Sequence, residues 1–185
     1  MSNPIRIVIA DDQALVRGAL ASLLSLEPDI EVVGQVGRGD EVLGLVTSTG
    51  ASVALLDVEM PGLDGLAVAR QLRDAGLACR SLIVTTFGRP GYLRRALESG
   101  AFGFVVKDTP AHQLADAVRR VHAGLRVIDP LLATESLITG SSPLSARETD
   151  VLLALRSEGS IADVAKLLHL SEGTVRNHLS SAIGK

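Results

Sequence analysis

The sequence contains little of what disulfide-bonded, metal-thiolate or membrane proteins need. Cys79 is its only cysteine, which excludes both an intrachain disulfide and a cysteine-rich zinc site. No apolar run approaches the roughly 18 residues that a membrane helix needs. No signal peptide fits the first residues, because an acidic pair follows one short apolar run. We therefore predict a cytoplasmic protein without membrane insertion.

Aromatic residues and excess charge are also scarce. Phe, Tyr and Trp make up 2% of the 185 residues, so a core must be built from Leu, Val, Ile and Ala. The 18 Lys and Arg against 21 Asp and Glu give a net charge of -3. This excludes a globally basic, nucleic-acid-binding surface, but not a local one. Apolar residues amount to 46%, enough for the core of one or two domains and too many for a disordered chain.

Short runs rich in β-branched and other apolar residues recur at regular intervals in the first two thirds of the chain. They are Arg6–Ala10, Glu31–Val36, Val53–Asp57, Ser81–Thr85 and Phe102–Val106. The first, third and fourth are almost continuously apolar, which is typical of parallel strands buried on both faces. Apolar residues at helical spacing fill the segments between them. We predict an α/β domain over residues 1–124, with a doubly wound, five-stranded parallel sheet.

The pattern changes after residue 124. Residues 125–143 carry Pro, Thr, Ser and Gly without a clean period, and we predict a linker there. Residues 144–185 contain no strand-like run, while three serines stand where they would cap helices. These helices are expected at Ser145–Leu155, Ser160–Leu168 and Ser171–Ile183. The sequence thus predicts a second, small all-α domain.

Polar residues stand at the carboxyl ends of four of the predicted strands. They are Asp11, Asp12, Asp57, Thr85 and Lys107. The strand ends of a doubly wound sheet converge on one edge, so three carboxylates would meet there and repel one another unless a cation lay between them. Mg²⁺ suits such ligands, and a carboxylate beside a metal and a lysine suits phosphoryl transfer to Asp57. A single strand-end Asp usually caps a helix and a single Lys usually lies on the surface, but the joint pattern favours a site.

The last two predicted helices and the short turn between them have the spacing of a helix-turn-helix. The second of these helices would present a polar face, on which Arg suits guanine or phosphate and Asn suits adenine. The residues on or near that face are Ser171, Thr174, Arg176, Asn177, Ser180 and Ser181. Spacing alone leaves a second possibility equally open, namely a three-helix interaction module whose polar face is only solvated.

Two segments resemble the receiver domain of two-component response regulators. The run Ile7–Asp12 is similar to the opening of such domains, and Leu55–Gly65 is similar to their phosphorylation loop. Lys107 matches the lysine of the family, and Phe104 falls at its aromatic switch position. The resemblance covers residues 5–124 and implies a flavodoxin-like receiver fold.

The resemblance also implies a role for each polar position. Asp57 would accept a phosphoryl group from a sensor histidine kinase. The implied Mg²⁺ ligands are Asp12, Asp57 and the backbone carbonyl of Glu59, assisted by Asp11. Thr85 would hydrogen-bond the phosphoryl group and Lys107 would pair with it. Thr85 would then move inward and Phe104 would change rotamer, a local charge event that biases a two-state surface.

The helical end resembles the LuxR-type helix-turn-helix in two stretches, Leu144–Leu152 and Leu170–Leu179. A receiver joined to that module implies the NarL/FixJ class of transcription regulators, in which phosphorylation promotes homodimerisation and binding to promoter DNA. Phe87–Ala96 further resembles the DesR-like branch, which implies regulation of membrane-lipid desaturation. The family's module continues into another helix beyond Lys185, so we expect residues 144–185 to be a truncated form of it.

Other functions fit the sequence less well. The main alternative is a receiver that acts only through protein partners, with a helical end that does not bind DNA. An Asp-nucleophile phosphatase would carry a second Asp where Glu59 stands. A dinucleotide-binding enzyme would follow the first strand with a Gly-rich loop, where Asp11–Gln13 stand instead. We therefore predict a regulator that is not an enzyme.

Overall fold

The chain divides into two compact units, Met1–Ile138 and Thr139–Lys185. The computed structural model describes residues 3–86, 92–129, 144–158, 160–168 and 170–183. Part of the segment with the DesR-like resemblance and most of the predicted linker therefore lie outside the described residues.

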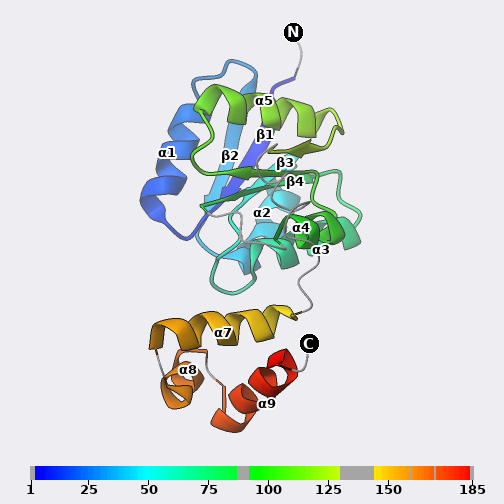
Figure 1. Ribbon diagram of the computed structural model, residues 1–185. Coiled ribbons are helices and arrows are strands. Elements are labelled where there is room, and N and C mark those ends of the chain that lie inside the picture. Colours follow the sequence, from blue (N-terminus) through cyan, green and yellow to red (C-terminus); the bar gives the residue numbers. More distant parts are fainter. Residues whose placement is uncertain (1–2, 87–91, 130–143, 159, 169, 184–185) are drawn as a thin grey trace. The chain divides into compact units, whose positions relative to one another are not determined.

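The first unit is built on a six-stranded parallel sheet (Figure 1). Its strands are β1 (Ile5–Ala10), β2 (Ile30–Val36), β3 (Val53–Leu56), β4 (Arg80–Thr85), β5 (Gly103–Val106) and β6 (Val127–Ile128). The strand order is β2-β1-β3-β4-β5-β6, so the predicted α/β class and parallel sheet are confirmed. The order reverses at β1, which has β2 on one side and β3 on the other. In such sheets the crevice at this reversal, beyond the carboxyl ends of the strands, is where ligands bind.

The number of strands corrects our prediction of five. The short β6 pairs in parallel with Gly103 and Phe104 of β5, within the segment predicted to be a linker. Its Val127 is 8% exposed and donates a backbone hydrogen bond of 2.9 Å to the carbonyl of Phe102. A strand of two residues has no period of its own, so only the pairing with β5 reveals it.

Helices cover both faces of this sheet (Figure 1). They are α1 (Ala14–Leu24), α2 (Val42–Thr49), α3 (Gly65–Asp74), α4 (Tyr92–Ser99) and α5 (Ala111–His122), with the short 3-10 turn η1 (Gly39–Glu41) before α2. Alternate residues of β1 show the two layers, because Ile7 packs with α1 and α5 while Val8 packs with α2, α3 and α4. Burial on both faces is the reason why the central strands are continuously apolar.

The described part of the second unit is a three-helix module. Its helices are α7 (Ala146–Glu158), α8 (Ile161–Leu167) and α9 (Glu172–Ile183). Val151, Val164 and Val175, one from each helix, are fully buried at its centre. The predicted helix starts are confirmed by three capping hydrogen bonds. The backbone N–H groups of Glu148, Asp163 and Thr174 donate to the hydroxyls of Ser145, Ser160 and Ser171 at 3.2, 3.2 and 3.1 Å.

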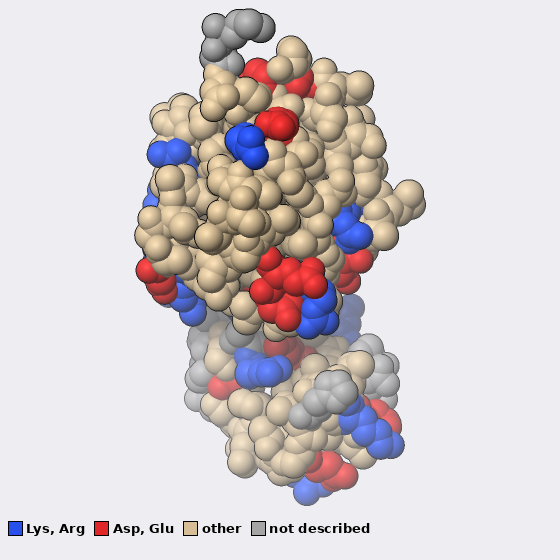
Figure 2. Space-filling model, turned by 180° about the vertical axis from the view of Figure 1, so that it is seen from behind, with Lys and Arg blue, Asp and Glu red and all other residues tan. Residues whose placement is uncertain are grey.

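The surface carries charges of both signs. Figure 2 shows acidic and basic side chains scattered among uncharged ones, and blue and red side chains lying next to one another on the helical unit. Three ion pairs in that unit, Arg147–Asp150, Lys166–Asp163 and Arg176–Glu172, agree with this view. Among the described helices, none combines the length and the apolar character that crossing a membrane requires.

Candidate functional site

Three of the predicted polar residues meet beyond the ends of β1, β3 and β5. The ammonium of Lys107 lies 2.7 Å from Oδ2 of Asp11 and 3.3 Å from Oδ2 of Asp57. All three side chains are buried, with exposed fractions of 7%, 2% and 5%. Backbone hydrogen bonds just beyond the strand ends hold these residues next to the neighbouring strands. The N–H of Asp57 donates to the carbonyl of Ala10 at 2.9 Å, and the N–H of Lys107 donates to the carbonyl of Thr85 at 2.7 Å.

Each polar group of Asp11 has a partner. Its backbone N–H donates to Val36 at 3.2 Å, and its Oδ1 accepts from the backbone N–H of Gln13 at 2.9 Å. Its Oδ2 faces Lys107, and its carbonyl accepts from the guanidinium of Arg17. Asp11 therefore orients the lysine and the loop after β1 from a buried position.

The pKa of Asp57 is raised from 3.8 to about 6, because burial disfavours its charged form. The ammonium of Lys107 opposes this shift, and the nearby carboxylate of Asp11 adds to it. The backbone N–H of Val58 also donates to Oδ1 of Asp57 at 2.8 Å. The charged form of Asp57 is thus costly in the protein alone, and any further cation that binds beside it would stabilise that form.

The loop after β3 passes close to the first turn of α3. A Cβ added at Gly65 would lie 2.0 Å from the carbonyl oxygen of Asp57, so only glycine allows this approach. The N–H of Gly65 donates to the carbonyl of Val58 at 3.0 Å, and the carboxylate of Asp64 caps α3 by accepting from Ala67 at 2.7 Å. These contacts hold the segment that carries Asp57.

An open pocket of about 160 Å³ lies in front of Asp57. Its lining residues include Asp12, Gln13, Glu59, Thr85, Thr86 and Tyr92. Asp12 is exposed, while Thr85 is 6% exposed at the end of β4. One carboxylate oxygen from each of Asp11, Asp12 and Asp57 lies within 4.8 Å of the others, so this donor set fits a hard divalent cation such as Mg²⁺. The Glu59 residue lines the pocket, and the use of its carbonyl as a ligand stays a prediction.

Phe104 lies away from the pocket lining. It is 1% exposed and packs in the core layer that includes Leu93 and Ala96 of α4. The switch roles of Thr85 and Phe104 stay predictions.

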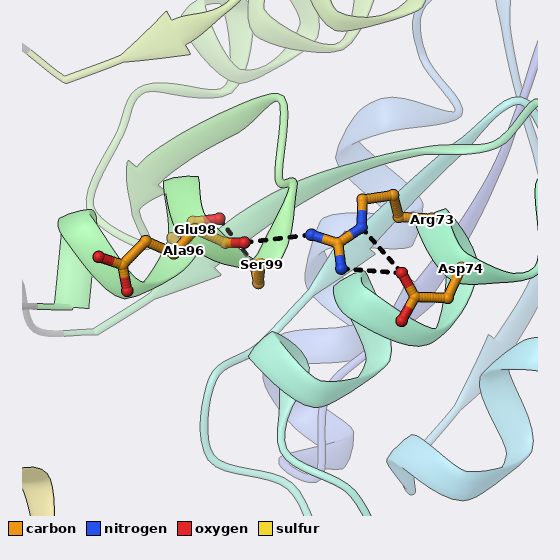
Figure 3. A network of polar contacts seen from close by, with 5 residues as sticks. All are labelled: Arg73, Asp74, Ala96, Glu98 and Ser99. Atoms are coloured by element: carbon orange, nitrogen blue, oxygen red, sulfur yellow. Dashed lines mark hydrogen bonds and ion pairs between the residues drawn. The ribbon is translucent and has the colours of Figure 1, made fainter.

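The helix α4 is tied at one end and lines the pocket at the other. Near its C-terminus, Arg73 of α3 donates to the backbone carbonyl of Glu98 at 3.1 Å, and the hydroxyl of Ser99 donates to the carbonyl of Ala96 at 2.7 Å (Figure 3). At its first residue, Tyr92 lines the pocket. The contact between α3 and α4 therefore supports one wall of the site.

Sequence reasoning missed several residues of this site. Thr86 directly follows a predicted strand end, so its position was a usable signal. Arg17 and Tyr92 carried none, because each reaches the site from a helix whose placement only the folded sheet defines. Gln13 enters through its backbone N–H, which no side-chain pattern could reveal.

The predicted DNA-binding residues do not share one environment. Arg176, Asn177 and Ser180 of α9 are exposed, and Arg176 pairs with Glu172 at 3.2 Å. At the start of the helix, the hydroxyls of Ser171 and Thr174 lie 2.8 Å apart, and the Ser171 hydroxyl caps the helix by accepting from the backbone N–H of Thr174. These five residues are at or near the outer surface of the module.

Ser181 is exposed as well, but its hydroxyl has a partner within the module. Its hydroxyl donates to Oε1 of Glu148 at 2.5 Å, and Glu148 is 3% exposed. The other oxygen of Glu148 accepts from the backbone N–H of Ser145 at 2.6 Å. Ser181 therefore joins α9 to the start of α7, and its hydroxyl is used within the module.

Both units match known protein families. The family described as the response regulator receiver domain matches residues 7–119, and the luxR family of bacterial regulatory proteins matches residues 142–185. The chain belongs to the response regulators. A receiver followed by a LuxR-type module is the NarL/FixJ arrangement, as the sequence predicted, and this family comprises transcription regulators rather than enzymes.

Individual relatives are similar to this response regulator along almost its whole length. The transcriptional regulatory protein DesR of Bacillus subtilis is 41% identical over 98% of this chain and 89% of its own. A probable transcriptional regulatory protein NarL of Mycobacterium tuberculosis is 34% identical, over 97% of this chain and 88% of its own. The crystal structure of the response regulator ChrA, from a heme-sensing two-component system, is 35% identical with a TM-score of 0.66 and covers 97% of this chain and 89% of its own.

The raised pKa of Asp57 predicts how stability depends on pH without metal. An unfolded Asp loses its proton near pH 4, whereas native Asp57 keeps its proton to about pH 6. Stability that this proton supplies at low pH is therefore lost as the pH rises through that window. Replacing Asp57 with Asn removes the effect. In chelator-treated samples, we expect the unfolding free energy of Asp57→Asn minus that of wild type to grow by about 2–3 kcal/mol from pH 4 to pH 7. The unfolding free energies are measured by denaturant titration at each pH. The same pH dependence in wild type and Asp57→Asn would contradict the raised pKa of Asp57.

Proposed function

We propose that this response regulator is a phosphorylation-controlled transcription factor. Asp57 accepts a phosphoryl group from a sensor histidine kinase in the presence of Mg²⁺. The modification promotes pairing of receivers and binding of α9 to promoter DNA. The observation that carries the proposal is the buried Asp11–Lys107–Asp57 group, which lies beside an open pocket with Asp12 on its wall. The two-component system named for the ChrA structure supports a kinase as the donor.

The chemistry follows from the placement of each side chain. A carboxylate oxygen of Asp57 attacks the phosphorus, while the bond to the donor's imidazole nitrogen breaks and its electron pair stays on that nitrogen. Lys107, 3.3 Å from the Asp57 carboxylate, is placed to pair with a phosphoryl oxygen, and the Thr85 hydroxyl is placed to donate to another. Mg²⁺, held by Asp12, Asp57 and the carbonyl of Glu59, would neutralise charge on the phosphoryl oxygens.

The same group of residues supports a switch. A phosphoryl group adds nearly two negative charges where Lys107 already balances Asp11 and Asp57. Recruitment of Thr85 toward that charge would open space at the end of β4, next to the layer in which Phe104 supports α4. A surface change there would bias receivers toward pairing, and a pair would place two α9 helices on half-sites one DNA turn apart.

DNA contact rests on the outer face of α9. Arg176 offers a fork of donors for guanine or phosphate, and Asn177 can pair with adenine. Ser171, Thr174 and Ser180 have hydroxyls close enough to this face to contact phosphates. Binding to promoter DNA and to a kinase's phosphotransfer domain would place the protein in the cytoplasm. The desaturation target stays a prediction that rests on the segment Phe87–Ala96.

Phosphate incorporation tests the first half of this proposal. Full-length protein treated with a small phosphodonor and Mg²⁺ should gain one phosphoryl group by intact-mass spectrometry, and a chelator should prevent it. Asp57→Ala should abolish the gain, whereas Asp74→Asn, an exposed acid at the far end of α3, should not. Persistent labelling of the Asp57→Ala protein would show that Asp57 is not the phosphoacceptor.

Operator binding tests the second half. Arg176→Ala should weaken binding of the full-length protein to its own promoter region by about tenfold or more, the size of a lost base or phosphate contact. Arg147→Ala is the matched control, because Arg147 is similarly exposed and also pairs with an acid on its own helix. Retained binding by the Arg176 variant would count against α9 as the reading helix. Failure of the wild type to give a salt-dependent shift would favour the alternative, a receiver that acts only through protein partners.

A further inference from the structure

A second, wider pocket lies next to the one in front of Asp57. This outer pocket has a volume of about 540 Å³ and lies between the loop after β3 and the helix α4. Asp12, Glu59 and Tyr92 line both pockets, so the two are adjacent. A molecule that delivers a phosphoryl group to Asp57 could occupy the outer pocket with its remaining part.

One cationic side chain stands in this outer pocket. Arg95 of α4 lines it, and the Arg95 guanidinium carbon lies 5.3 Å from the centroid of the Tyr92 ring, a cation–π arrangement. Among the described residues that line either pocket, Arg95 is the only basic one, whereas four carry carboxylates. Lys107 lies behind Asp57 and is not part of the lining.

The position of Arg95 is supported by the rest of α4. Tyr92 and Arg95 are one turn apart on this helix, whose far end is tied to α3 through Arg73 (Figure 3). The neighbouring Arg94 points to a different partner, since its guanidinium pairs with Glu98 at 3.0 Å. Two adjacent arginines on one helix therefore have different surroundings, which provides an internal control.

The geometry of phosphoryl transfer determines which part of the phosphodonor lies near Arg95. The attacking and leaving atoms lie roughly in line through phosphorus, so the leaving group is on the side away from Asp57, toward the opening of its pocket. A guanidinium there favours a leaving group that departs with negative charge, and its planar fork matches a carboxylate. Ammonia or imidazole leaves without that charge.

We propose that Arg95, held over Tyr92, forms a leaving-group subsite that adapts this site to small acyl phosphates. The inference rests on the proposed role of Asp57. In the step, a bond forms between an Asp57 oxygen and phosphorus. The bond between phosphorus and the donor's acyl oxygen breaks, and the electron pair leaves on the donor's carboxylate. No proton is transferred, and the departing carboxylate pairs with Arg95.

The test compares two donors on the full-length protein with Mg²⁺. Rate constants for phosphorylation by acetyl phosphate, which releases acetate, and by phosphoramidate, which releases ammonia, are measured by intact-mass spectrometry. Arg95→Ala should lower the acetyl phosphate to phosphoramidate ratio about two- to fivefold, the size of one exposed charge contact. Arg94→Ala should keep the wild-type ratio. Added salt should lower the ratio in the wild type and have less effect in Arg95→Ala, because exposed charges are screened.

The outcomes separate this inference from the proposed function. If neither donor labels the wild type, the role of Asp57 fails. If both donors label it and Arg95→Ala leaves the ratio unchanged, or lowers both rate constants equally, the subsite is overturned while the role of Asp57 stands. An equal fall in the ratio for Arg94→Ala would also overturn it, because the effect would then belong to the general charge of α4.

Discussion

The receiver depends on one buried ammonium shared between two buried carboxylates. Lys107, Asp11 and Asp57 come from three different strand ends, and their charged atoms lie within 3.3 Å across each ion pair. Charges removed from water must be paired, because an uncompensated buried ion costs several kcal/mol. One lysine against two carboxylates leaves a local excess of negative charge. That excess makes the site receptive to a further cation, and it raises the pKa of Asp57.

The surrounding fold follows from the need to hold this group. The reversal of strand order at β1 sends α1 and α3 to opposite faces and leaves a crevice where the Asp57 pocket lies. Gly65 allows α3 to begin against the carbonyl of Asp57, and Arg17 holds the carbonyl of Asp11 from the other side. The pocket wall includes the first residue of α4, Tyr92. A change of charge at Asp57 therefore occurs next to a helix that lies at the receiver surface.

Local sequence patterns could predict the sheet and the convergence of its polar ends. Continuous apolar runs indicated strands covered on both faces, and the strand-end positions of Asp57 and Lys107 placed them at one edge. The sheet's last strand was missed because two residues have no periodicity. The predicted DNA contact of Ser181 stays a prediction, but a helical repeat alone could not reveal its partner Glu148, 33 residues earlier in the chain. Long-range contacts of this kind depend on how helices pack.

The central claim is that charge at Asp57 controls DNA binding by α9, and one measurement tests it directly. The affinity of full-length protein for its own promoter region is measured by fluorescence anisotropy at one fixed salt concentration, before and after phosphorylation. We predict binding about tenfold tighter or more after phosphorylation, a coupling typical of linked sites. Equal affinities of the two forms, in protein shown to be fully phosphorylated, would contradict it.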